Sequence, residues 1–190
     1  YNWTPWAAAR IKPPMIFGHE FCGEVVQVGS QVTAFQVGNL VAADSHVPCG
    51  HCYQCQTGNQ HICDTMAILG VHRDGCFAEY ISLPQASAWK LAPDTSPDLG
   101  AIMEPFGVAV HGVASDTVEG RNVAIFGCGP SGLLAVGTAR ALGAFKIFVS
   151  EINQSRLEMA HLVAPEAVLL NPTQTDVVAA IRAATKGQGV

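Results

Sequence analysis

The sequence predicts an α/β protein in two parts: a β-rich part over residues 1–100 and a doubly wound parallel sheet over residues 101–190. Three observations support this prediction. Short apolar runs separated by glycine extend as far as residue 92, four closely spaced cysteines interrupt them, and strand-like and helix-like patterns alternate after Arg121. Such alternation is typical of a parallel sheet with helices on its faces.

The first part reads as strands around a loop, followed by a helix. Apolar and polar residues alternate between turn residues in three segments that we expect to be strands: 21–30, 37–45 and 76–84. The cysteine-containing lobe, residues 46–64, has little regular pattern and should be a loop that a metal holds. Ser96 as N-cap and Pro97 at the first helical position predict a helix that runs to residue 114.

The second part alternates strands with helices. The expected strands are 122–127, 146–150 and 166–170, and the expected helices are 130–143, 153–163 and 173–187. Gly143 is in the position of a helix C-cap.

Composition narrows the class of protein. The chain has 190 residues, of which 49% are hydrophobic and 13% charged, so it can bury a core, and its formal charge is −5. The absence of a basic patch argues against nucleic acid as a partner, and no apolar stretch is long enough to span a membrane. Seven cysteines without a signal peptide suit a reducing cytoplasm. The start at Tyr1 and the stop after a helix suggest an internal piece of a longer polypeptide.

Four cysteines, Cys49, Cys52, Cys55 and Cys63, have the spacing C-x2-C-x2-C-x7-C. Four thiolates this close in sequence can surround one zinc tetrahedrally and leave no open position, which predicts a structural site. Disulfides are disfavoured because no secretory signal precedes the cluster. An iron–sulfur cluster is disfavoured because the ferredoxin run ends in a shorter gap followed by proline, whereas Asp64 follows here.

A glycine-rich turn, GCGPSG, follows the strand expected at 122–127 and opens a helix. Gly127 permits the tight turn, Gly129 lets the backbone approach a pyrophosphate, and Gly132 lets the helix pack on the strand. Pro130 and Ser131 complete the turn, and the free N–H groups of the helix start favour phosphate. The motif is weak alone, but this context predicts a dinucleotide site.

Glu151 ends the second strand of this unit, nineteen residues after Gly132. An acid there can accept hydrogen bonds from the adenosine ribose and repel a 2′-phosphate, which favours NAD over NADP. Arg156 could instead suit a 2′-phosphate. We prefer a contact between Arg156 and the adenosine end of NAD.

A second metal site is predicted at His19, Glu20 and Glu104. Glu104 lies among apolar residues, and a buried carboxylate needs a partner or a metal. One imidazole with carboxylates leaves room for water or substrate, as in catalytic zinc sites. One ligand is then missing. Cys22 and Cys76 are candidates by type, although both are expected to pack as small apolar residues.

The remaining histidines divide into three groups. His46, at the mouth of the lobe, either contacts substrate or satisfies its own loop. His51 and His61 are expected on the surface of the lobe, because the cysteines already complete the tetrahedron. The others are expected to be structural: His72, His111 and His161.

The chain resembles the zinc-dependent medium-chain dehydrogenases over essentially all of its length. The motifs that carry the resemblance are GHEFCGEVVQVGSQVTAFQVGN, CGHCYQCQTGNQHIC, DGCFAEY and GCGPSG. The segments YNWTPWA, RIKPPMIFGHEF, GVHRDGCFAEY and MEPFG are most similar to the branch that oxidises L-threonine. The polyol branch, of the sorbitol and butanediol type, shares the zinc motifs and stays open as an alternative.

The resemblance implies a GroES-like catalytic domain followed by a Rossmann domain, both incomplete here. It implies NAD, one structural zinc, and one catalytic zinc held by His19, Glu20, Glu104 and a cysteine upstream of this segment. It also implies a small alcohol as substrate and a homo-oligomer, a dimer or tetramer. Val108 departs from the asparagine expected in the threonine branch.

Two other classes remain to be weighed. A zinc-ribbon binding module on a degenerate nucleotide fold would need neither His19–Glu20 nor Glu151. A zinc-free quinone reductase of the same superfamily would not be expected to keep the four-cysteine lobe.

Overall fold

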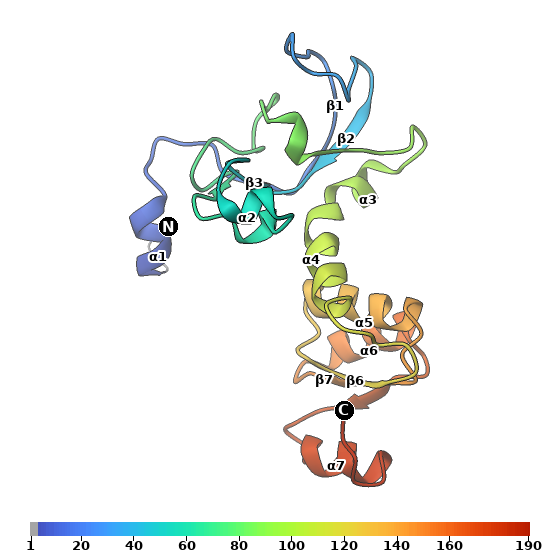
Figure 1. Cartoon of the computed structure of the whole chain (residues 1–190). Helices are drawn as coiled ribbons and strands as arrows, with labels where there is room; N and C mark the ends of the chain where they lie inside the picture. The colour runs from blue at the N-terminus through green and yellow to red at the C-terminus, as the bar shows by residue number, and fades with distance from the viewer. Residues whose placement is uncertain (1–3) are drawn as a thin grey trace. The chain divides into compact units, whose positions relative to one another are not determined.

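A computed structural model describes residues 4–190. Tyr1–Trp3, which begin the segment YNWTPWA used in the resemblance, lie outside the described residues. The chain divides into two compact units, residues 1–104 and residues 105–190 (Figure 1). The predicted succession of a strand-containing part and an α/β part is confirmed.

The first unit contains two small antiparallel sheets. The larger has the order β1-β2-β5, and the smaller pairs β3 with β4. The strands are β1 (Cys22–Glu24), β2 (Leu40–Ala43), β3 (His46–Val47), β4 (Ala67–Ile68) and β5 (Ala88–Lys90). The central strand β2 buries Val41, Ala42 and Ala43. Short helical turns join these strands: α2 (Tyr53–Gln56), η1 (Gln60–Ile62) and η2 (Gln85–Ser87).

Helix α1 (Pro5–Arg10) was not expected from the sequence. Its signal is present, because Thr4 acts as N-cap and Pro5 takes the first helical position. The Thr4 hydroxyl accepts a hydrogen bond from the Ala7 N–H at 3.1 Å. The rings of Trp6 and His72 then meet edge to face, 6.4 Å apart.

The strand expected at 76–84 is wrong. The chain there follows residues 16–18 instead, where the N–H groups of Gly75, Cys76 and Phe77 donate to carbonyls of that segment. The approach at this crossing is too close for side chains, since a Cβ on Gly75 would overlap the carbonyl oxygen of Gly18. A regular ladder does not form, and β5 takes the place of the third strand.

The long helix expected from residue 97 is broken in two. α3 (Pro97–Ala101) and α4 (Met103–Val113) are separated at Ile102. Pro105 explains the break, because it has no N–H for the carbonyl four residues earlier and its ring clashes with that carbonyl. That carbonyl belongs to Ala101, the last residue of α3. Ser96 is the N-cap of α3, as predicted.

The second unit is a parallel three-stranded sheet of order β6-β7-β8. Its elements, in chain order, are β6 (Asn122–Phe126), α5 (Pro130–Ala141), β7 (Lys146–Ser150), α6 (Gln154–Val163), β8 (Val168–Leu170) and α7 (Val177–Ala184). All six predicted elements are present. Gly143, just after α5, has a φ of +81°, as its predicted role at the helix end requires.

Helices cover both faces of this sheet, as Figure 1 shows. α5 and α6 pack on the face that carries Ile147 and Val149. α7 packs through Ile181 on the opposite face, which carries Phe148. Alternate residues of β7 therefore serve two cores, which is why its centre, Ile147–Phe148–Val149, is continuously apolar. Among the described residues, no helix has the length and apolar character needed to cross a bilayer.

Candidate functional site

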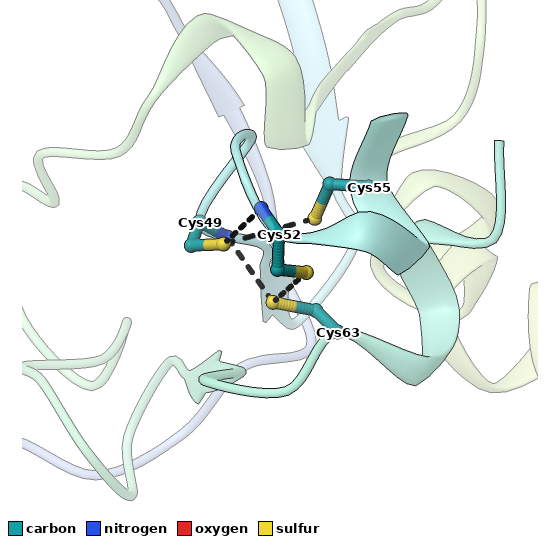
Figure 2. A group of neighbouring side chains, drawn as sticks. All are labelled: Cys49, Cys52, Cys55 and Cys63. Atoms are coloured by element: carbon teal, nitrogen blue, oxygen red, sulfur yellow. Dashed lines mark hydrogen bonds between the residues drawn. The ribbon is translucent and has the colours of Figure 1, made fainter. Parts of the chain in front are cut away.

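The four cysteines of the lobe converge on one point. Cys49 and Cys52 precede α2, Cys55 lies within it, and Cys63 follows η1 (Figure 2). All four sulfur atoms lie within 4.8 Å of one another. The turn of α2 and the return through η1 thus bring together sulfur atoms from residues up to fourteen positions apart in the sequence.

The spacing of the sulfurs fits zinc. A Zn–S bond of about 2.3 Å gives a tetrahedron with edges of about 3.8 Å. The Cys49–Cys55 and Cys52–Cys63 sulfur pairs are each 3.9 Å apart, and all four cysteines are free thiols. Disulfide bonding requires about 2.05 Å between sulfurs, so this arrangement supports a metal and not a disulfide pair.

Backbone N–H groups prepare part of this cluster for a metal. The N–H of His51, then that of Cys52, lower the pKa of the Cys49 thiol to about 5. The backbone N–H of Cys49 lowers the pKa of Cys63, and donates to its sulfur at 3.3 Å. Burial raises the pKa of Cys55 to about 12. A bound cation would overcome that cost, because coordination deprotonates a thiol outright.

A second group of ligand atoms, from His19, Glu20 and Glu104, also lies within 4.8 Å. His19 and Glu104 are half-buried, and Glu20 is exposed. Glu104 stands in the first turn of α4, just before Pro105, and the other two follow the loop that ends at Gly18. Residues far apart in sequence thus bring together one nitrogen and two oxygen ligand atoms, close enough to bind one cation. Their role as ligands stays a prediction.

A corner of three glycines fixes the backbone before His19. Gly18 has a φ of +89°. A Cβ on Gly70 would lie 2.7 Å from the backbone nitrogen and oxygen of Gly18, and a Cβ on Gly75 would overlap the same carbonyl oxygen. Only residues without a side chain allow backbones to meet this closely. The position of His19 is therefore set by main-chain contacts from the 70–75 segment.

The glycine-rich turn of the second unit has the geometry predicted for a dinucleotide loop. Gly127 has a φ of +87°. A Cβ on Gly132 would overlap the carbonyl oxygen of Gly127, so the first turn of α5 packs directly on the loop. α5 begins at Pro130, and no side chain caps it through its N-cap residue Gly129. Its free N–H groups suit an anionic phosphate.

Glu151 is buried, and the loop itself engages its carboxylate. The N–H of Cys128 donates to one oxygen at 2.8 Å, and the N–H of Asn153 donates to the other at 2.9 Å. These two bonds, the Asn153 one first, lower the pKa of Glu151 against the opposing effect of burial. Arg156 approaches the carboxylate at 3.7 Å. Sequence reasoning missed the bond to Cys128, which joins the loop to the end of β7.

The other predicted residues lie as follows. His46 is half-exposed in β3, and its ring nitrogen Nδ1 lies 2.9 Å from Asp44. The Cys22 sulfur lies close to Gly100, and the Cys76 sulfur points to the Glu20 carbonyl at 3.7 Å. Sequence reasoning missed Asp44, although an acid two residues before a histidine was a signal available in the sequence.

Comparison with known proteins agrees with this geometry. Residues 2–94 match the alcohol dehydrogenase GroES-like domain. An L-threonine 3-dehydrogenase from Caldanaerobacter subterraneus subsp. tengcongensis is 46% identical over 189 residues, which is 100% of this chain and 54% of that protein. The chain thus spans about half the length of the curated relatives it matches.

Two crystal structures are also similar. One, described as a zinc-binding dehydrogenase from Sinorhizobium meliloti 1021 bound to NADP, is 38% identical, with a TM-score of 0.84 over 90% of this chain and 50% of that chain. The other, 2R,3R-butanediol dehydrogenase from Bacillus subtilis, is 35% identical, with a TM-score of 0.82 over 93% of this chain and 50% of that chain.

The chain is similar over its whole length to the zinc-dependent medium-chain alcohol dehydrogenase family, whose GroES-like domain its residues 2–94 match. Within that family, its sequence is similar to L-threonine 3-dehydrogenases. The predicted fold class and the resemblance are both confirmed.

Proposed function

We propose that this protein oxidises a secondary alcohol with NAD and zinc, and that the alcohol is L-threonine, which becomes 2-amino-3-ketobutyrate. One observation carries the proposal above the others. The His19–Glu20–Glu104 set occurs together with a dinucleotide loop in a chain 46% identical to an L-threonine 3-dehydrogenase. A binding module would need neither the open ligand set nor the acid after β7.

His19, Glu20 and Glu104 would hold the catalytic zinc, and the four cysteines of the lobe would hold the structural one. Zinc held there would supply Lewis-acid polarisation of the substrate hydroxyl, and bound NAD would supply the hydride acceptor. The imidazole of His19 would be the one nitrogen ligand among the three described residues of this site. The carboxylates Glu20 and Glu104 balance the charge of the cation.

The second unit would hold the cofactor. The Cys128 N–H is already bonded to Glu151, so the pyrophosphate is left to the N–H groups at the start of α5. A carboxylate offers about four lone-pair positions, and two backbone N–H groups occupy one each on Glu151. The remainder can accept from the ribose hydroxyls, while the negative charge opposes a 2′-phosphate. Arg156 then lies beside the adenosine.

A polyol substrate is the second candidate. It is favoured by the similarity to butanediol dehydrogenase, and by Val108, which stands where the threonine branch is expected to have asparagine. A pocket built to hydrogen-bond the charged groups of an amino acid would discriminate strongly against a plain diol, because the polar groups of the pocket would be left unpaired.

The test follows NADH formation by the full-length protein with L-threonine, 2,3-butanediol and sorbitol separately. L-threonine should have the highest kcat/KM. A higher value for butanediol or sorbitol would assign the protein to the polyol branch, and equal turnover with NADP would refute the proposed role of Glu151.

A further inference from the structure

His46 is half-exposed, yet polar contacts hold both its backbone and its ring. Its side chain is 39% exposed, yet its backbone is fixed on both sides. The His46 N–H donates to the Asp44 carboxylate at 2.9 Å, and its carbonyl accepts from the Ser87 hydroxyl at 3.0 Å. Ser87 is 1% exposed, so the support comes from within the protein.

The ring of His46 is fixed as well. Its Nδ1 lies 2.9 Å from the same Asp44 oxygen and 3.3 Å from the hydroxyl of the buried Ser45. An ionised carboxylate can only accept, so the proton of this bond is carried by the ring. A neutral imidazole has one N–H. The Nε2 atom is therefore left with a free lone pair, and His46 offers an acceptor on its outer side.

These contacts around His46 are connected through the backbone to the three glycines, Gly18, Gly70 and Gly75, that fix the position of His19. His46 pairs with Ile68 across β3 and β4, and the carbonyl of Ser45 accepts from the N–H of Leu69, which is fully buried. Gly70 comes next and lies against Gly18, the residue before His19. Only Leu69 separates Ile68, the residue opposite His46, from Gly70 in the sequence.

We infer that Asp44 is a positioning residue, which holds His46 in the Nδ1–H tautomer so that Nε2 accepts a hydrogen bond from a donor group of the substrate. This inference rests on the proposed function, in which the substrate carries such a donor in its ammonium group. A competing explanation is that Asp44 only closes the turn before β3, as aspartates often do.

The tautomer can be read without turnover. The full-length protein is labelled with 15N-histidine, and His46 is assigned in solid-state NMR spectra by its loss in His46→Gln. The protonated nitrogen of His46 should be Nδ1 in the native protein. In Asp44→Ala the proton should move largely to Nε2, and Asp44→Asn, which keeps a neutral acceptor, should lie between. Protonation at Nε2 in the native protein, or an unchanged spectrum in Asp44→Ala, would overturn the inference.

A double-mutant cycle then tests the link to catalysis. Asp44→Ala should lower kcat/KM for L-threonine about tenfold to a hundredfold, the worth of a hydrogen bond to a charged group. The same substitution should have almost no effect when His46 is already alanine. Asp176→Ala is the matched control, because Asp176 also accepts a backbone N–H, that of Ala179 at 3.0 Å, at the start of α7 in the second unit. This control should retain native kinetics.

The outcomes separate the inference from the proposed function. An Asp44→Ala effect of equal size with and without His46 would assign Asp44 a purely structural role and overturn the inference. If the native protein shows the Nδ1–H tautomer but does not oxidise L-threonine, the substrate proposal fails while the positioning role of Asp44 stands.

Discussion

A methyl group added at Gly132 should test how the nucleotide loop is built. The Cβ of Gly132→Ala would overlap the carbonyl oxygen of Gly127 and lie 2.9 Å from its carbonyl carbon. Carbon atoms in contact are ordinarily about 3.5–4.0 Å apart, so the start of α5 has to move by roughly 1 Å. Overpacking of this kind costs about 1–3 kcal/mol, offset by up to about 1 kcal/mol of helix propensity gained on replacing glycine.

Gly129→Ala is the matched control, since it adds the same methyl group to the same turn, three residues before Gly132. Gly129 has a φ of −72°, and its Cβ would meet only the Arg156 guanidinium at 4.0 Å. Its cost to stability should be limited to the weaker capping preference of alanine, about 1 kcal/mol or less. The methyl would, however, point where a pyrophosphate must approach.

The assay pairs denaturant midpoints of the full-length protein with fluorescence titration of NADH. Gly132→Ala should lower the midpoint and weaken NADH binding, whereas Gly129→Ala should weaken NADH binding with a nearly native midpoint. Equal midpoints for the two variants would refute the packing argument. Native NADH affinity in Gly129→Ala would refute the placement of the pyrophosphate.

Four further outcomes are expected. Cys55→Ser should lose about one zinc per subunit by elemental analysis, together with much of the stability, because metal binding in such lobes contributes folding energy; unchanged zinc content would disprove the structural site. His19→Ala should abolish turnover and leave NADH binding nearly intact, and retained activity would place the catalytic site elsewhere. Glu151→Ala should lower the ratio of kcat/KM with NAD to kcat/KM with NADP. Equal kcat/KM values for the two cofactors in the native protein would contradict this role of Glu151. Because the pKa of Glu151 is lowered in the folded state, its contribution to stability is present above the pKa of an unfolded glutamate and is lost as pH falls through the folded value. Glu151→Gln should therefore flatten part of the acid side of the stability profile, and an unaltered profile would contradict this.

The second unit was predictable because its signals are local. Each of its three apolar strands is followed by a turn and a helix. The N-cap side chains of Asn153 and Asp176 accept backbone hydrogen bonds in the first turns of α6 and α7. Its sheet is parallel and buried by helices, so apolar runs identify the strands directly. Local pattern and tertiary structure agree at every element there.

The first unit was less predictable because its contacts are not local. The segment 76–84 has a strand pattern, but its N–H groups reach residues 16–18, sixty positions away, at a crossing of glycines. The break at Ile102 was readable from Pro105, whereas the meeting of Glu104 with His19 and Glu20 was a hypothesis from residue types and from the family resemblance. No local pattern predicts that meeting, since it depends on how α4 enters the fold.

The two candidate sites share one structural device, although their chemistry differs. At the metal site, Gly70 and Gly75 approach Gly18 so closely that no side chain fits between the backbones, and His19 follows directly. At the nucleotide site, Gly132 meets Gly127 in the same way, and the free N–H groups of α5 follow. In both cases main-chain contact, and not side-chain packing, sets where the functional atoms lie. Glycine at these positions is therefore a requirement of site geometry, because even a methyl group would displace the atoms that are proposed to bind zinc or phosphate.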